Sequence, residues 1–536
     1  MSPLPSSDRW REYAVKGAHL GLRQVAQAPE QRAARRLAAQ AARRPAPGAH
    51  APRVTVLTPR SWAVHVQWEA MIAQALRVRG ADVAFVTCGG GLEICDRDNL
   101  WEAPPMPCRG CAHYVGSSIE AHGFEATPMA DGWGDTPAEW PELDELSFAQ
   151  LAEVTYRGVP LGELVDIPVK WFLMSADVDH DPLAPLTFRR FLRAGRRVVD
   201  GLAAALDRTR PDVVVLLNGL FFFESIAWQL CRDRGIDVVT YERGFIKETL
   251  VFRRNQAACL YEMDELWAEW ADVALSDAES DELAGYLRER ELGLRTIDRF
   301  WGDARFDDPE RQRPGRLVSL FTNLTWDSAV IGQELAFDSI GSWVSAAIEA
   351  FADRPDDELV VRIHPAEVKL PGKQTREPIA ELIGRRFDTL PPNVRIMGAD
   401  DPTSSYPLMV ASDAVLVFTS TTGLEAALRG IPVVVAGRTH YRNRGFTVDV
   451  SSPTEFARAV DEVLADPAAF APDVERALRY AYLFFFRNPV ASPGVEEHVL
   501  GLARLTVEDL DDLAPGADPA VDEICDLVLG PSPAWP

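Results

Sequence analysis

The segment spanning residues 406–449 constrains the fold of this chain more than any other. It reads YPLMVASDAVLVFTSTTGLEAALRGIPVVVAGRTHYRNRGFTVD. A short apolar run at 415–418 is typical of a buried parallel strand. A helical stretch follows, and Gly430 and Pro432 end it before a second apolar run at 433–436. The pattern predicts a strand, a tight turn, a helix and a second strand of an α/β sheet.

The tight turn after the first of these strands carries small polar residues. Ser420, Thr421, Thr422 and Gly423 stand where free N–H groups and hydroxyls converge, which suits a phosphate or another anion. Glu425 lies one turn inside the helix, within reach of a ribose or sugar hydroxyl. The alternative interpretation is an ordinary strand–turn–helix with a Ser/Thr cap.

A second strand end carries polar residues of a similar kind. The apolar run at 359–363 leads into Arg362, His364 and Glu367 in the sequence VVRIHPAE. Ligands of open α/β sheets bind outside the carboxyl ends of the strands. The two strand ends are therefore expected to open into one crevice.

Four blocks of the C-terminal half resemble the glycosyltransferases of the bacterial capsule polysaccharide biosynthesis family, the Kdo-transferase-like group with a GT-B fold. The blocks are LFTNLTWDSA, RIHPAE, SYPLMVASDAVLVFTSTTGLEAALRGIPVVVAG and HYRNRGFTVD. The resemblance covers residues 315–465 well and the N-terminal half loosely. It implies that His364 and Glu425 face a nucleotide-sugar donor.

The donor site is accordingly expected in the C-terminal half. Arg362 and the turn at 420–423 would neutralise phosphate charge as the leaving group departs, and His364 would position or protonate that group. Further residues expected at this site are Asn323, Glu367, His440 and Tyr441. No Asp-x-Asp sequence stands near the four blocks. A metal-independent transfer is therefore predicted, with arginine in place of a cation.

The N-terminal half has the same α/β rhythm, with apolar runs at 54–57, 83–87, 213–217 and 238–241. Strands that alternate with helices predict a doubly wound parallel sheet. The expected fold class is α/β, with two Rossmann-like domains facing a cleft (GT-B). The expected segments are a basic arm (1–50), an acceptor domain (51–310) with a Cys-rich loop insertion (88–122), a nucleotide-sugar domain (311–470), and C-terminal helices with an acidic tail (471–536).

Polar residues of the N-terminal half are expected to line the acceptor side of the cleft. Besides His65, they are Glu69, Asn218, Glu242 and Arg243. His65 and Glu69 share one face of a predicted helix. His65, whose ordinary pKa suits proton transfer near neutral pH, is the first candidate for the catalytic base. Asp327 is the competing candidate.

Four cysteines form a separate constellation between the second strand and residue 111. They are Cys88, Cys95, Cys108 and Cys111, and the last two make a Cys-x-x-Cys in a Pro-rich stretch. Such a set predicts a structural zinc. An iron–sulfur cluster, which uses the same ligands, is the second interpretation. Unrelated reduced cysteines with a chance Cys-x-x-Cys remain the alternative.

Charge and hydropathy exclude several classes of protein. The net charge is −25, which argues against a nucleic-acid-binding surface. The opening sequence lacks the pattern of a signal peptide, and no apolar run is long enough to span a membrane. A cytoplasmic protein is expected. Residues 1–50 hold nine Lys/Arg against three acidic residues. They predict either a peripheral contact with anionic lipid or, preferably, a solvated leader.

The expected function is transfer of a sugar from a CMP-, UDP- or GDP-linked donor to a glycan or lipid-linked glycan acceptor of the bacterial surface or capsule. Two alternatives stay open. One is a non-hydrolysing nucleotide-sugar epimerase, which shares the two-domain fold. The other is an inactive scaffold subunit of a polysaccharide assembly complex.

Overall fold

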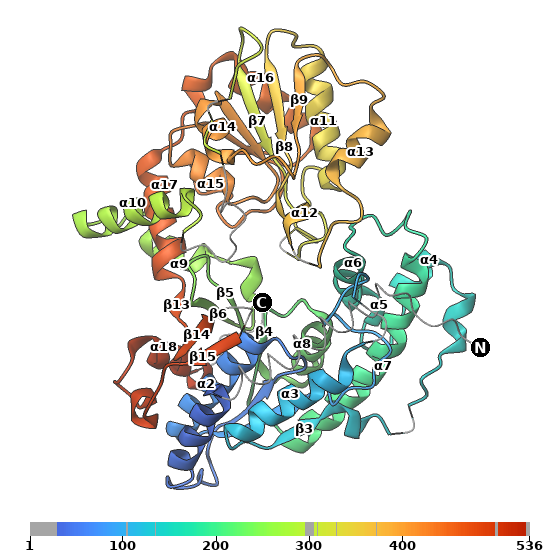
Figure 1. Ribbon diagram of the computed structural model, residues 1–536, viewed down its shortest axis with the longest axis vertical. Coiled ribbons are helices and arrows are strands. Elements are labelled where there is room, and N and C mark those ends of the chain that lie inside the picture. Colours follow the sequence, from blue (N-terminus) through green and yellow to red (C-terminus); the bar gives the residue numbers. More distant parts are fainter. Residues whose placement is uncertain are drawn as a thin grey trace, which may run out of the picture.

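The protein is described by a computed structural model over residues 29–102, 106–134, 136–294, 305–307, 309–328, 330–370, 372–498 and 502–531. Two bodies of alternating strands and helices lie one above the other (Figure 1), each built on its own sheet. This mixed α/β architecture with parallel strands confirms the predicted fold class.

The N-terminal sheet has the order β13-β6-β5-β4-β1-β2-β3. Its parallel strands are β1 (Arg53–Leu57), β2 (Asp82–Thr87), β3 (Ala126–Pro128), β4 (Val213–Leu217) and β5 (Asp237–Arg243). Two antiparallel strands complete one edge, β6 (Thr249–Arg254) and β13 (Val490–Ala491). Strand β4 reads VVVLL and is buried throughout, as a central parallel strand requires.

Helices cover both faces of this sheet. The main ones are α2 (Ala63–Val78), α3 (Cys108–Ala121), α7 (Ala184–Thr209) and α8 (Phe222–Arg234). The shorter helices α4 (Phe148–Ala152), α5 (Leu161–Leu164) and α6 (Asp166–Leu173) precede α7. Helix α6 brings Trp171 to the cleft side of this body.

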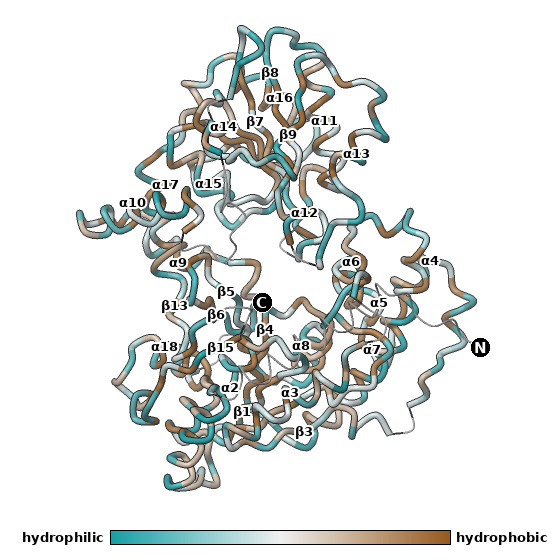
Figure 2. The backbone as a smooth tube through the Cα atoms, in the orientation of Figure 1, coloured by the Kyte–Doolittle hydropathy of each residue, from teal (hydrophilic) through white to brown (hydrophobic). Residues whose placement is uncertain are grey.

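The C-terminal sheet has the order β12-β11-β10-β7-β8-β9, and its neighbouring strands pair in parallel. Its strands are β7 (Leu317–Phe321), β8 (Glu358–Arg362), β9 (Val394–Met397), β10 (Ala414–Val417), β11 (Val433–Val435) and β12 (Val448–Asp449). Helices α11 (Ile340–Ala352), α12 (Ala366–Lys369), α13 (Ile379–Arg386), α14 (Ser405–Ala411), α15 (Thr422–Ala427) and α16 (Pro453–Ala465) surround it. Hydrophobic residues gather along the central strands of this sheet (Figure 2), where β7, β8 and β10 are fully buried.

The chain passes between the two bodies more than once. Helices α9 (Asp264–Trp270) and α10 (Asp277–Glu291) lead towards the C-terminal body, and α17 (Val474–Tyr482) leads back. The last strands and helix, β14 (Val495–His498), β15 (Leu502–Leu505) and α18 (Pro519–Leu529), then pack on the N-terminal body. The C-terminal segment thus completes the hydrophobic core of the N-terminal body.

Part of the basic arm is folded onto the N-terminal body. Residues 29–41 form a helix whose Leu37 and Ala41 are buried in the core around α2, α3 and α18. The carboxylate of Glu30 accepts hydrogen bonds from Gln67 and Tyr114 at 2.9 and 3.2 Å. The expectation of a solvated leader or a lipid-binding face is wrong for this stretch, because its apolar side is occupied by the protein. Residues 1–28 lie outside the described part.

The Cys-x-x-Cys also differs from its prediction. Cys108 and Cys111 lie in the first turn of α3, a regular helix that crosses from β2 to β3, and not in an irregular loop insertion. In the part of the chain that the structure describes, no helix is both long and apolar enough to cross a membrane.

Candidate active site between the two sheets

A cavity of about 670 Å³ opens between the two bodies, at the carboxyl ends of the C-terminal strands. The C-terminal body contributes residues that follow β7, β8, β10 and β11, and the N-terminal body contributes aromatic and acidic residues. Predicted site residues that line it are Asn323, Asp327, Arg362, His364, Ser420, Thr421, Thr422, Glu425, His440 and Glu242. The strand ends therefore do meet in one crevice, as parallel packing requires.

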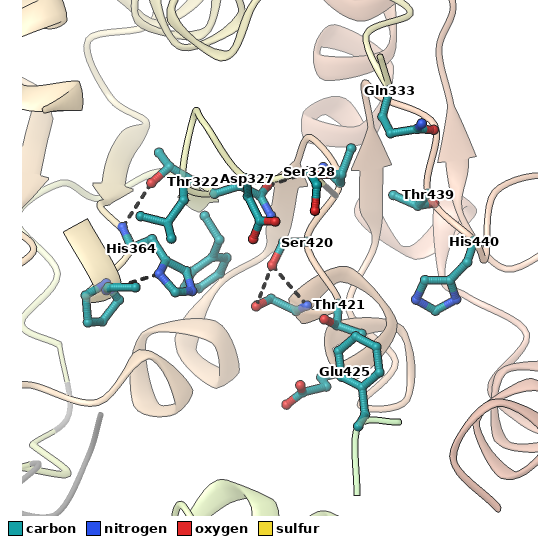
Figure 3. Close-up of a pocket in the computed structure, with 18 of the residues that line it drawn as sticks. Thr322, Asp327, Ser328, Gln333, His364, Ser420, Thr421, Glu425, Thr439 and His440 are labelled. Carbon is teal, nitrogen blue, oxygen red and sulfur yellow. Dashed lines mark hydrogen bonds between the residues drawn. The ribbon is translucent and has the colours of Figure 1, made fainter. Parts of the chain in front are cut away.

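His364 is held as a neutral hydrogen-bond donor beside this cavity (Figure 3). Its Nδ1 accepts the backbone N–H of Ala366 at 3.2 Å, so the proton of the neutral ring lies on Nε2. Its own backbone N–H donates to Thr322 Oγ1 at 3.0 Å. Burial lowers the pKa of His364 to about 4, and the Arg362 guanidinium adds to that shift. The ring can therefore donate a hydrogen bond at neutral pH without carrying charge.

This depressed pKa predicts a pH-dependent stability. An unfolded histidine takes up a proton below about pH 6.5, whereas folded His364 stays neutral down to about pH 4. The unfolded state binds more protons in that window, so stability falls as the pH falls through it. Between pH 7 and pH 4, the free energy of unfolding measured in urea should fall by up to roughly 3 kcal/mol more for wild type than for His364→Gln. Equal losses in the two proteins would contradict the buried, neutral ring.

The hydroxyl turn after β10 is preorganised by contacts outside the cavity. Ser420 Oγ lies 3.0 Å from Thr422 Oγ1 and accepts the Thr422 backbone N–H at 3.2 Å. Tyr441, which is buried and does not line the cavity, donates its hydroxyl to the Ser420 carbonyl at 2.6 Å. A Cβ at Gly423 would collide with that same hydroxyl. Gly423 and Tyr441 thus support the turn, and Ser420, Thr421 and Thr422 face the cavity.

Glu425 is fixed by two partners that the sequence reasoning did not identify. Arg290 of α10 donates its Nε to the carboxylate at 2.8 Å, and the Tyr406 hydroxyl donates at 2.6 Å (Figure 3 shows the Glu425 side chain). The carboxylate and the guanidinium are only 6% and 14% exposed. Glu425 therefore enters the site as one half of a buried ion pair.

Arg362 and Glu367 were expected to be accessible donor-binding groups, but both are buried. The Arg362 guanidinium donates to the carbonyls of Gly398, Asp401 and Thr403, which braces the segment after β9. Glu367 is buried away from the cavity, where it accepts the Ile379 backbone N–H at 3.2 Å. Burial raises the pKa of Glu367 to about 7.

Three buried polar atoms at the cavity have no hydrogen-bond partner among the described residues. They are Thr419 Oγ1, Thr439 Oγ1 and His440 Nε2. The other ring nitrogen of His440 lies 3.0 Å from the Tyr480 hydroxyl, and the ring stacks on Phe484 at 3.8 Å. Buried polar atoms are seldom left unsatisfied in folded proteins. All three atoms belong to residues that line the same cavity.

Two carboxylates from different bodies, Glu242 and Asp327, line the same cavity. Glu242, at the end of β5, accepts the Asn218 amide at 3.1 Å and the Arg243 backbone N–H at 2.8 Å. Asp327 lies in the segment after β7. Burial raises the pKa of Glu242, and the nearby Asp327 charge contributes in the same direction. A carboxyl group with a raised pKa is suited to accept a proton.

A second cavity, of about 870 Å³, adjoins the first on the N-terminal body. Trp171, Glu242 and Lys373 line both cavities, so the two cavities share part of their walls. His65 and Arg243 line only the second. This second space is where an acceptor would approach Glu242.

His65 belongs to a buried network that faces away from the first cavity. Its Nδ1 lies 3.2 Å from the Tyr241 hydroxyl, which donates to Glu69 at 2.6 Å. Burial and the nearby Arg243 and Arg60 charges lower the pKa of His65 well below its ordinary value. Burial raises the pKa of Glu69 to about 8. Asn218 is buried too and acts through Glu242.

Two Rossmann-like bodies that enclose a polar cavity define a protein of the GT-B class. Residues 274–483, less than half of the chain, match the family model described as "Capsule polysaccharide biosynthesis protein". This match confirms the resemblance of the C-terminal sequence blocks to that family. No curated protein matches the chain.

Several solved structures are similar to this chain at low identity. Thermosulfurimonas dismutans KpsC, a beta Kdo 2,4 transferase, is 16% identical with a TM-score of 0.36, over 56% of this chain and 86% of that one. The calicheamicin glycosyltransferase CalG4 is 16% identical with a TM-score of 0.27, over 82% and 96%. The UDP-GlcNAc 2-epimerase of Neisseria meningitidis is 11% identical with a TM-score of 0.25, over 80% and 95%. At such scores the chemistry has to be argued from the site itself.

Proposed function

We propose that the protein is a glycosyltransferase that moves a sugar from a nucleotide-sugar donor to a hydroxyl of a surface or capsule glycan. The observation that carries the proposal is that Glu242 lines both of the adjoining cavities. One cavity has a wall of hydroxyls and a neutral histidine, and the other has room for a second substrate. A transferase needs both substrates to meet at one proton acceptor.

The C-terminal wall would hold the nucleotide sugar. The Ser420, Thr421 and Thr422 hydroxyls and the Nε2–H of His364 are donors suited to phosphate oxygens. The sugar or the base would hydrogen-bond to the unpartnered atoms Thr419 Oγ1, Thr439 Oγ1 and His440 Nε2. Glu425, whose two carboxylate oxygens already accept from Arg290 and Tyr406, would accept a further hydrogen bond from a ribose or sugar hydroxyl.

Transfer would proceed by attack of the acceptor oxygen on the anomeric carbon. The new glycosidic C–O bond forms as the bond to phosphate breaks, and the nucleotide leaves with the electron pair. Glu242 would take the acceptor proton, with Asp327 as the second carboxylate at that point. Donors on the C-terminal wall would stabilise the charge that develops on phosphate. Nucleotide sugars of the cytoplasm would serve as donors, so we propose a cytoplasmic location for the protein.

A binding measurement tests the donor site directly. A ligand that binds only the folded state adds about 2.7 kcal/mol at a hundredfold excess over its Kd. We expect one family among CMP-, UDP- and GDP-sugars to raise the Tm of wild type. His364→Ala and Glu425→Ala should lose this shift, and the exposed-site controls His180→Ala and Glu265→Ala should keep it.

The alternatives give different outcomes in the same series. Interconversion of a free nucleotide sugar with no transfer to any glycan would identify an epimerase. Absence of a shift with every nucleotide sugar would overturn the proposal and leave the scaffold function.

A further inference from the structure

Four cysteines from three segments of the N-terminal body line a single cavity of about 250 Å³. Cys88 directly follows β2, Cys95 lies in the next loop, and Cys108 and Cys111 occupy the first turn of α3. The remaining cysteines, Cys231, Cys259 and Cys525, do not line it. Folding therefore gathers the four residues of the Cys-rich segment around one space and leaves the other three elsewhere.

Backbone N–H groups point at three of the four sulfur atoms. Ser61 donates to Cys111 Sγ at 3.3 Å. Gly90 and Arg97 donate to the sulfurs of Cys88 and Cys95. Such N–H···S bonds stabilise negative sulfur and tune metal–sulfur clusters.

The backbone around the cavity is shaped to allow this approach. Gly90 has a φ of +87°, and a Cβ there would press on Cys108 at 3.4 Å. The neighbouring Gly89, at a φ of +79°, has Pro128 within 2.8 Å of its Cβ position. The fourteen-residue helix α3 begins at Cys108, so its positive end lies beside two of the thiols.

The four cysteines surround a cavity of about 250 Å³, which offers more room than a single metal ion needs. A zinc ion draws each sulfur to about 2.3 Å, so its four ligands crowd around one point. Among the described residues, no group of three or more His, Cys, Asp or Glu side chains is arranged to hold a metal ion. This arrangement therefore does not support the expected single zinc site. An iron–sulfur cluster has a core of its own and spreads its four thiolates around a larger volume.

We propose that Cys88, Cys95, Cys108 and Cys111 hold a [4Fe–4S] cluster in this cavity. The remaining wall is largely apolar, with Leu92, Met106 and Phe223 among its residues, and excludes water from the core. Four thiolates from one body complete the ligand set, and no open coordination position is left for chemistry. The role of the cluster is structural.

The cluster would support the acceptor cleft. Cys111 lines both the cysteine cavity and the larger N-terminal cavity. Ser61, which donates to Cys111, also accepts the Arg97 Nε at 3.0 Å, and Trp62 beside it lines the cleft. Loss of the cluster should therefore loosen the cleft wall while the C-terminal donor site stays intact.

The test is the metal content of the full chain produced and purified without oxygen. We expect iron and acid-labile sulfide in equal amounts, about four of each per chain, a broad visible absorption, and an electron paramagnetic resonance signal after reduction. Cys108→Ser and Cys111→Ser should lose most of the iron and the signal. The buried control Cys231→Ser, outside the cavity, should retain them.

Two results would overturn the proposal. One is zinc at one ion per chain without sulfide. The other is a folded chain, checked by circular dichroism, that takes up no cluster when incubated anaerobically with ferrous iron and sulfide. Neither readout depends on glycosyl transfer, so failure here is distinct from failure of the proposed function.

Discussion

Glu242→Gln is expected to lower kcat by about 10²–10⁴-fold, the usual contribution of a positioned general base. The amide keeps the size of the side chain, and its single oxygen can keep one of the two bonds that Asn218 and Arg243 make to different oxygens of the carboxylate. It cannot take the proton of the acceptor hydroxyl. The nucleotide-sugar Kd should stay within a few-fold of wild type, because the donor wall belongs to the other body.

The pH profile separates this role from a structural one. Burial raises the pKa of Glu242, so the wild-type rate should rise with pH as the carboxyl loses its proton. The variant should lack that acidic limb. Glu265→Gln, an exposed change on α9, is the matched control and should behave as wild type. If Glu242→Gln leaves the pH–rate profile unchanged, Glu242 is not the base. Asp327 would then be the base, and Asp327→Asn should show the fall in kcat.

Local patterning was enough to predict the sheets. Buried apolar runs such as VVVLL at β4 and the segment around β10 are found where their sequence placed them. The polar ends of β7, β8 and β10 were identifiable because parallel strands end at one edge. The short strand β3 and the edge strand β13 carry no such pattern, since three and two residues cannot show a period.

The side-chain partners could not be predicted from the same information. Glu425 and Arg290 are 135 residues apart, and only the path of α10 between the bodies brings them together. Arg362 ends β8 and His65 lies in the first turn of α2, positions where active-site groups are often found. Tertiary contacts instead join His65 to the Tyr241 hydroxyl and Arg362 to backbone carbonyls. Spacing along the chain also left zinc and an iron–sulfur cluster undecided for the four cysteines, because the ligand types are identical.

The buried pair of Glu425 with Arg290 leads to the second large effect. Arg290→Met leaves the Glu425 carboxylate buried with only the Tyr406 hydroxyl as its partner. Removal of one member of a buried ion pair costs about 3–5 kcal/mol, because the remaining charge is uncompensated. We expect a loss of that size in the free energy of unfolding, measured in urea. Arg504→Met, which removes an exposed pair with Glu496, is the control and should cost about 1 kcal/mol or less.

The double variant Arg290→Met/Glu425→Leu tests whether the ion pair serves stability alone or also donor binding. Replacing a buried pair by apolar side chains is often neutral, so the double variant should recover most of the stability that Arg290→Met loses. If Glu425 contacts the donor, this stable protein will still give no shift in Tm with the nucleotide sugar that wild type binds. If it binds that sugar as wild type does, Glu425 serves only to join α10 to α15, and the donor contacts lie with His364 and the hydroxyl turn. A double variant as unstable as Arg290→Met would contradict the uncompensated-charge argument itself.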